Sequence, residues 1–174
     1  WDYDFSHRDN IPADEAIART RELIFAAVER QLISDVPVGS YLSGGIDSGA
    51  IVAIASRHVQ RIQTFTGGFE MSKVEGYEAG FDERRAAEIM AYTYGSEHYE
   101  QVLNAGDIRW ALPRVIWHLE DLRLGMSYPN YYVSRLAAKF VKVCLSGAGG
   151  DELFGGYPWR YYHVFRSIDP ESYF

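Results

Sequence analysis

The sequence predicts an α/β fold in which a parallel β-sheet carries helices on both faces. Short apolar runs of strand length alternate with longer segments whose apolar residues recur at helical spacing, as in a series of βαβ units. Two glycine-rich stretches, Ser43 to Ser48 and Ser146 to Asp151, each follow a predicted strand directly. Because ligands bind beyond the carboxyl ends of parallel strands, both stretches are expected to face one crevice.

The first half of the chain supplies two helix–strand units after a lead-in segment, residues 1–12. Pro12 and Asp14 are typical of the first turn of a helix, and apolar residues then recur at helical spacing to about Leu32. A strand, the first glycine-rich stretch, a second helix and a second strand follow, ending in the turn signal Gly67-Gly68. The elements expected here are helix 13–32, strand 36–42, helix 48–57 and strand 61–66.

The second half continues the alternation with weaker strands. Lys73 to Gly80 has the composition of a loop, and Asp82 and Glu83 are interpreted as the acidic first turn of a helix rather than as metal ligands. Val141 to Leu145 is a short, mainly apolar run that leads directly into the second glycine-rich stretch. The elements expected here are helix 82–90, strand 97–102, helices 110–119 and 131–140, and strand 141–145.

Composition is typical of a soluble globular domain. The 174 residues are 47% hydrophobic and 24% charged, with a net charge of −7, so no nucleic-acid partner is expected, since such a partner usually requires a basic face. No apolar run has the length of a membrane span, so no membrane partner is expected. The single cysteine, Cys144, excludes an internal disulfide, which favours a reducing compartment and a cytoplasmic localisation. It lies in an apolar strand and is interpreted as a core residue.

The stretch Ser-Gly-Gly-Ile-Asp-Ser, from Ser43 to Ser48, has the features of a phosphate site. Its glycines let the backbone approach an anion, and the amides at the start of the next helix point toward that anion. The hydroxyls of Ser43 and Ser48 add donors, and Asp47 can hold a metal against the bound oxygens. The pattern differs from Walker A, which needs a longer glycine loop ending in Lys-Ser/Thr. It resembles the PP-loop of ATP pyrophosphatases, which split ATP between the α- and β-phosphates.

A second motif makes the resemblance more specific. The run from Leu145 to Tyr157, taken with the first motif, resembles the synthetase domain of the asparagine synthetases, as does Phe65 to Phe69. The resemblance implies a Rossmann-like PP-loop ATP pyrophosphatase fold. It also implies that residues 13–174 are the N-terminal part of the ATP-binding domain of a longer protein. A glutaminase domain and a C-terminal remainder would lie elsewhere in the intact chain, and this fragment alone is expected to be inactive.

The resemblance implies a two-step ligation with ATP, aspartate or a related carboxylate, and ammonia as substrates and Mg²⁺ as cofactor. The side-chain carboxylate of aspartate attacks the α-phosphate and releases pyrophosphate; ammonia derived from glutamine then converts the acyl-adenylate to asparagine and AMP. Asp47 and Asp151 are implied as catalytic residues that hold Mg²⁺, and a homo-oligomer is left open. The nucleotide-binding residues implied are Tyr41, Leu42, Ser43, Gly44, Gly45, Asp47, Ser48, Gly67, Ser146 and Gly147.

Two departures from the family pattern keep alternatives open. Ala148 stands where asparagine synthetases often have Glu, and Glu120 to Gly125 stands where the family commonly has Asp-Glu-Pro and a different loop. Both bear on the acceptor, so a paralogous amidotransferase or a lactam-forming synthetase with another carboxylate acceptor is one alternative. A catalytically inactive nucleotide-binding module is another, although a pure binding module does not need both Asp47 and Asp151. Acidic residues such as Asp151 and Glu152 also stabilise a helix N-terminus with no metal present.

Overall fold

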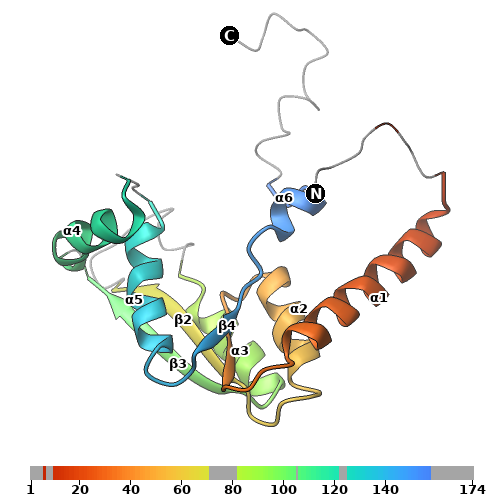
Figure 1. Ribbon diagram of the computed structural model, residues 1–174, viewed down its shortest axis with the longest axis horizontal. Helices are drawn as coiled ribbons and strands as arrows, with labels where there is room; N and C mark the ends of the chain where they lie inside the picture. Colours follow the sequence, from red (N-terminus) through yellow and green to blue (C-terminus); the bar gives the residue numbers. More distant parts are fainter. Residues whose placement is uncertain (1–5, 7–9, 71–81, 105, 122–124, 158–174) are drawn as a thin grey trace, which may run out of the picture.

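A parallel four-stranded sheet forms the centre of the structure (Figure 1). The computed structural model describes residues 6, 10–70, 82–104, 106–121 and 125–157. The elements are α1 (Ala13–Gln31), β1 (Val38–Tyr41), α2 (Ile46–Ala55), β2 (Gln63–Phe69), α3 (Arg84–Thr93), β3 (Glu97–Leu103), α4 (Asp107–Leu119), α5 (Ser127–Ala137), β4 (Val143–Leu145) and α6 (Gly150–Phe154). The strand order is β3-β2-β1-β4, and every pairing is parallel. The predicted α/β class with a parallel sheet is confirmed.

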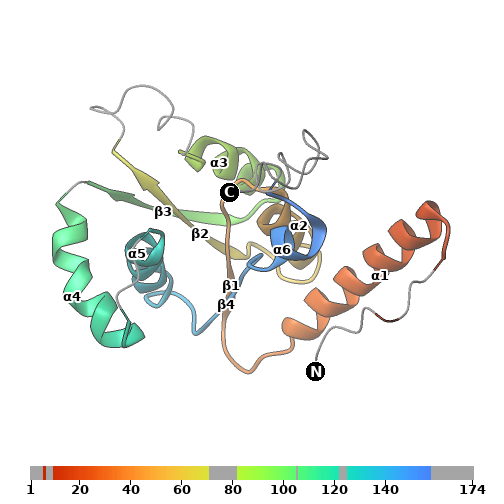
Figure 2. The ribbon, with the colours of Figure 1, turned by 90° about the horizontal axis from the view of Figure 1, so that it is seen from above.

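Helices cover both faces of this sheet (Figure 2), which confirms the second part of the fold prediction. On one face, α2, α3 and the end of α1 pack a core that contains Leu42 and Val52. On the other face, α5 packs against Phe65 through Val133 and Ala137, and α4 packs in turn on α5. Within the described ranges, no helix combines the length and apolar character needed to cross a membrane.

The prediction of a turn at Gly67-Gly68 is wrong, because both glycines lie inside β2 and pair with β3. Glycine is needed there for packing rather than for turning the chain. A β-carbon on Gly67 would lie 2.7 Å from Cγ2 of Val133, and a β-carbon on Gly68 would overlap the side chain of Arg84. The missing side chains let α5 approach one face of β2 and Arg84 lie across the other.

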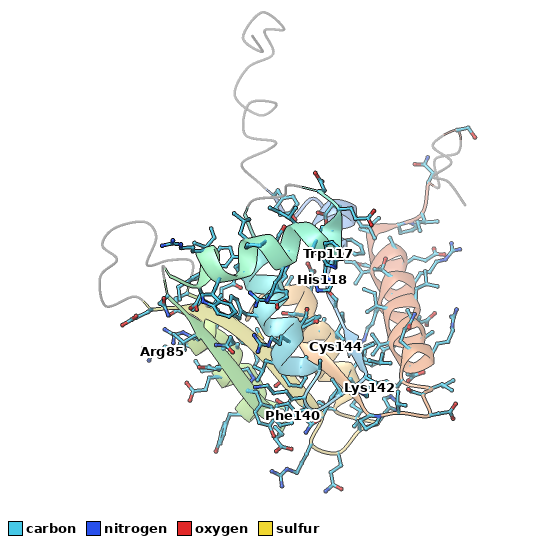
Figure 3. All side chains as sticks on the ribbon, turned by 60° about the vertical axis from the view of Figure 1, so that its left-hand side comes forward. Arg85, Trp117, His118, Phe140, Lys142 and Cys144 are labelled. Atoms are coloured by element: carbon cyan, nitrogen blue, oxygen red, sulfur yellow. The ribbon has the colours of Figure 1, made fainter. Side chains whose placement is uncertain are left out.

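The other boundaries shift by a few residues, as is usual for ends set by local turns. The helix expected from Ser48 begins two residues earlier, at Ile46, and this places Asp47 in its first turn. Cys144, interpreted as a core residue, is half-buried in β4 (Figure 3), and burial raises the pKa of its thiol to about 12. The loop expected at 73–80 lies outside the described residues.

Phe65 provides a test of the core. Its side chain is 1% exposed and stacks on Tyr99 with 5.8 Å between ring centroids. Phe65→Ala would leave a cavity at the centre of the sheet, so we expect the free energy of unfolding to fall by about 3–5 kcal/mol. Phe140→Ala is the matched control, because Phe140 stacks on the same Tyr99 at 4.0 Å but is 37% exposed (Figure 3). Equal losses for the two variants in chemical denaturation would contradict this description of the core.

Candidate functional site

The two glycine-rich stretches meet at the carboxyl ends of β1 and β4, which are neighbours in the sheet. A β-carbon on Gly147 would lie 2.9 Å from both Cβ of Asp47 and the amide nitrogen of Ser48, closer than the 3.0 Å that real β-carbons respect. Gly150 also lies directly against the Asp47 carboxylate. The two stretches are one hundred positions apart in the sequence and form one continuous surface.

The turn between β1 and α2 has the geometry of an anion site. Gly44 has a φ of +77°, a conformation that favours glycine. A β-carbon there would lie 2.7 Å from Cβ of Ala86, so the start of α3 packs directly on the turn. Gly45 is the extended residue before α2, and no side chain caps the amides of the first helical turn. Those amides and the positive end of the helix dipole are therefore left for a ligand.

The two serines of this turn are hydrogen-bonded to each other. Their hydroxyl oxygens are 3.0 Å apart, and the amide of Ser43 donates to Oγ of Ser48 at 3.1 Å. Oγ of Ser48 donates to the carbonyl of Gly45 at 3.2 Å. Ser48 is buried and Ser43 is exposed. The bonds close the turn into a ring and fix the position of both hydroxyls before any anion arrives.

The end of β1 offers its backbone rather than its side chains to this surface. The hydroxyl of Tyr41 is 2.9 Å from Oγ of Ser134 on α5, so the ring is directed toward that helix. The side chain of Leu42 is 1% exposed in the core. The hydroxyl of Thr66, in the middle of β2, donates to the carbonyl of Leu42 and ties the end of β1 to β2. Thr66 lies in the stretch Phe65 to Phe69 that resembles the family, but the motif did not indicate this structural role.

The acidic residues of the two stretches influence each other. The pKa of Asp47 is raised above its ordinary value, first by partial burial and then by the negative charges of Asp151 and Glu152. Asp151 and Glu152 lie in the first turn of α6, and Asp47 lies in the first turn of α2. Two helix N-termini therefore bring carboxylates toward one region, where a cation would relieve their repulsion.

These carboxylates fit a metal only together with a ligand that supplies more oxygen atoms. No group of three His, Cys, Asp or Glu side chains in the described part of the chain could hold a metal by itself. Mg²⁺ is commonly bound by one or two carboxylates together with substrate phosphates and water. The pair Asp47 and Asp151 has the donor set that such a shared site requires.

A side-chain clasp holds the start of α3 beside the site. Arg84 donates to the carboxylate of Asp82 at 2.8 and 2.6 Å and to the carbonyl of Phe69 at 3.1 Å. The hydrogen bond from Arg84 is the main cause of the lowered pKa of Asp82. Asp82 is thus an ion-pair residue just before α3, and the acidic first turn expected from Asp82 and Glu83 is wrong, because the helix begins at Arg84. Sequence reasoning missed Arg84, because no motif marks a residue that acts by joining α3 to β2.

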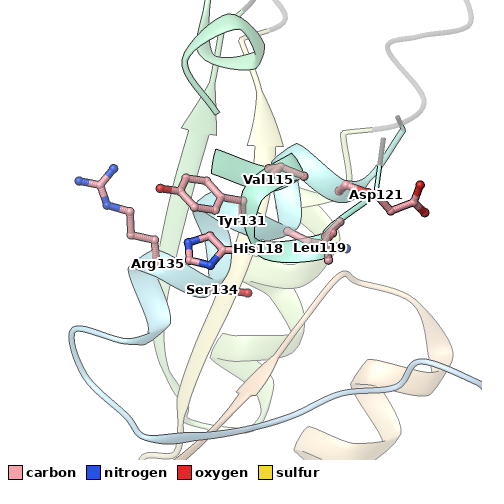
Figure 4. Close-up of a pocket in the computed structure, with 9 residues that line it drawn as sticks. Val115, His118, Leu119, Asp121, Tyr131, Ser134 and Arg135 are labelled. Atoms are coloured by element: carbon pink, nitrogen blue, oxygen red, sulfur yellow. The ribbon is translucent and has the colours of Figure 1, made fainter. Parts of the chain in front are cut away.

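A cavity of about 660 Å³ lies between α4 and α5 (Figure 4) and was not predicted. It reaches Ser134, the partner of Tyr41, and Asp121, within the segment Glu120–Gly125 that departs from the expected family pattern. Residues 122–124 of that segment lie outside the described residues. The lining residues are Val115, His118, Leu119, Asp121, Ser127, Asn130, Tyr131, Ser134 and Arg135.

Comparison with known proteins gives consistent results. Asparagine synthetase 1 (glutamine-hydrolyzing) of Bacillus subtilis is 40% identical over 145 residues, which cover 83% of this chain and 22% of that protein. A putative asparagine synthetase (glutamine-hydrolyzing) of Mycobacterium bovis is 44% identical over 148 residues, which cover 84% of this chain and 21% of that protein. The chain therefore spans about a fifth of the length of these relatives.

Among solved structures, an NH3-dependent NAD synthetase from Campylobacter jejuni aligns at 17% identity with a TM-score of 0.48. The alignment covers 80% of this chain and 60% of the chain of that synthetase. The family profile described as Asparagine synthase matches residues 19–173, which is most of the sequence. The chain belongs to the asparagine synthase family.

Proposed function

We propose that the intact protein is a glutamine-hydrolysing asparagine synthetase and that this chain provides its ATP-binding part. The observation that carries the proposal is the contact of Gly147 with Asp47 and Ser48. This contact joins an anion-binding helix N-terminus to a pair of carboxylates at the ends of neighbouring parallel strands. The names of the relatives support the same activity.

In the first step, an oxygen of the aspartate side-chain carboxylate bonds to the α-phosphorus of ATP, and the bond to the bridging oxygen of the β-phosphate breaks. Pyrophosphate leaves with additional negative charge. The amides of Gly44, Gly45 and the first turn of α2, with the hydroxyls of Ser43 and Ser48, are positioned to receive that charge. The adenosine is proposed to lie against the backbone of Tyr41 and Leu42, Gly67, and Ser146-Gly147.

Asp47 and Asp151 are proposed to hold Mg²⁺, which would neutralise charge on the phosphates. The negative charge of Asp151 contributes to the raised pKa of Asp47, and a shared cation would relieve this repulsion. Ammonia for the second step is proposed to come from a glutaminase domain elsewhere in the intact chain, since the relatives are named glutamine-hydrolyzing and are much longer. The single cysteine is consistent with a cytoplasmic reaction.

A second candidate is an amidotransferase that uses a different carboxylate acceptor. Ala148 favours this alternative, because it is exposed in the second glycine-rich stretch and its methyl group can neither move a proton nor hold a charge. Its amide donates to Oγ of Ser146 at 3.2 Å, so the backbone there is already engaged. The two candidates share the ATP site and differ in the acceptor.

Exchange of labelled pyrophosphate into ATP by the intact protein separates the candidates. With aspartate as the acceptor, we expect exchange that requires Mg²⁺, because adenylation is reversible before ammonia arrives. A panel of other amino-acid carboxylates is the control. Exchange with another acceptor but not with aspartate would favour the second candidate. The absence of exchange with every carboxylate would contradict adenylation by this site.

Asp47→Asn is expected to abolish Mg²⁺-dependent ATP binding and to raise the melting temperature of the ligand-free protein at pH 7. The raised pKa means that the folded state holds this proton more tightly than the unfolded state, so stability falls as pH rises above the ordinary value near 4. The gain in melting temperature should vanish below about pH 4, where both states are protonated.

Calorimetric titration with Mg²⁺-ATP and thermal unfolding across pH measure these two effects. Asp35→Asn is the matched control, since Asp35 is exposed in the turn before β1 and outside the site. A variant at Asp47 that lowers the melting temperature at pH 7, or that binds Mg²⁺-ATP as the wild type does, would contradict the proposed role.

Gly147→Ala tests the contact between the two stretches. The added methyl carbon would lie 2.9 Å from Asp47 and Ser48 and force the start of α2 to move. We expect ATP affinity to fall at least about tenfold, which corresponds to about 1.4 kcal/mol. Gly106→Ala is the control, because Gly106 is exposed, has a negative φ and lies outside the site. Unchanged ATP affinity in Gly147→Ala would contradict the proposal that ATP binding depends on this contact.

A further inference from the structure

An apolar groove of about 570 Å³ is lined by residues of α1 and α2. These two helices lie on the side of the domain away from α4 and α5 (Figure 2). The apolar lining residues of the groove include Ile17, Ile24 and Phe25 of α1, Ala53 of α2 and Phe154 of α6. α1 enters the core only toward its C-terminal end, and Ile17 in its first half remains 67% exposed. Nothing in the described part of the chain fills this groove.

Two arginines also line the groove and give it a positive charge. The guanidinium groups of Arg21 on α1 and Arg57 on α2 lie 5.6 and 5.0 Å from the centroid of the Phe25 ring. Within the described ranges, no carboxylate forms an ion pair with either group. An occupant should therefore combine large apolar side chains for the apolar lining with acidic groups for the two arginines.

We propose that the segment Trp1 to Phe5 of this chain occupies the groove. Its sequence, Trp-Asp-Tyr-Asp-Phe, alternates aromatic and acidic residues. In an extended conformation, alternate side chains point to opposite sides, so the three aromatic rings can face the apolar lining together. Asp2 and Asp4 then lie on the other side of the segment, where they can pair with the guanidinium groups of Arg21 and Arg57.

The length of the connection permits this arrangement. The eight residues from Phe5 to the start of α1 at Ala13 span up to about 26 Å when extended. Arg21 lies eight residues into α1, which is about 12 Å along the helix axis. Pro12 has extended backbone angles, with φ −57° and ψ 148°, so helical geometry does not continue backward through it. The segment can therefore fold back along α1.

The charge of the groove favours Trp1–Phe5 over the aromatic segment at the other end of the sequence. Residues 158–167 follow α6, near Phe154, and are also rich in aromatic side chains. They carry Arg160, His163 and Arg166 and no acidic residue before Asp169. Placed in the groove, these residues would bring positive charge against Arg21 and Arg57, which is unfavourable.

Disulfide trapping in the intact protein tests the proposal. Phe5→Cys combined with Ala53→Cys is expected to form an intramolecular disulfide at least about tenfold faster than Phe5→Cys combined with Arg19→Cys. Arg19 is exposed on α1, nearer to Phe5 in the sequence, and does not line the groove. Peptide mapping by mass spectrometry after mild oxidation measures both rates. Equal rates would overturn the proposal.

Three further variants distinguish this occupant from others. When Arg57→Glu is added to the double variant Phe5→Cys/Ala53→Cys, disulfide formation is expected to slow at least about threefold. Adding Asp4→Lys as well is expected to restore the rate. Slowing without restoration would contradict the charge pairing. Faster trapping between Tyr161→Cys and Ala53→Cys would assign the groove to the C-terminal segment, and predominant dimers of the single variant Ala53→Cys would assign it to a second copy. Either result would overturn the assignment to Trp1–Phe5.

Discussion

The parallel pairing of β1 with β4 is the constraint on which the candidate site depends. Its register places Ser40 opposite Leu145, so the two strands end at the same level of the sheet. Each strand then passes directly into a glycine-rich turn and a helix N-terminus. Because Gly147 lacks a β-carbon, its backbone can lie against Asp47, and the two turns share one surface. A shift of register would separate the first glycine-rich turn from Asp151.

Neighbouring elements support this contact from outside the motifs. Thr66 in the middle of β2 holds the carbonyl of Leu42, just after β1, while the start of α3 packs on Gly44. The clasp between Arg84 and the carbonyl of Phe69 keeps α3 in that place. The geometry of the short glycine turn is thus maintained by side chains from two further elements, and substitutions in those elements should reach the site through its backbone.

The sequence was sufficient to predict the features that depend on the spacing of apolar residues and on the positions where strands end. The parallel α/β architecture followed from the alternation of predicted strands and helices, and the meeting of the two glycine-rich stretches followed from their position directly after predicted strands. Gly67 and Gly68 were misassigned to a turn, because the same residue type also serves close packing, and local sequence does not distinguish the two uses. The Arg84 clasp and the α4–α5 cavity depend on tertiary contacts that no local pattern contains. The roles of the individual site residues remain predictions.

The long sequence separation within the site also has a consequence for synthesis of the protein. The ribosome completes the first glycine turn about one hundred residues before it adds Gly147, a delay of about 5–20 s at ordinary elongation rates. During that interval the emerging chain contains the first glycine turn but lacks Gly147 and Asp151. The surface that the two turns share can therefore form only late in synthesis, after β4 and the residues that follow it have been added.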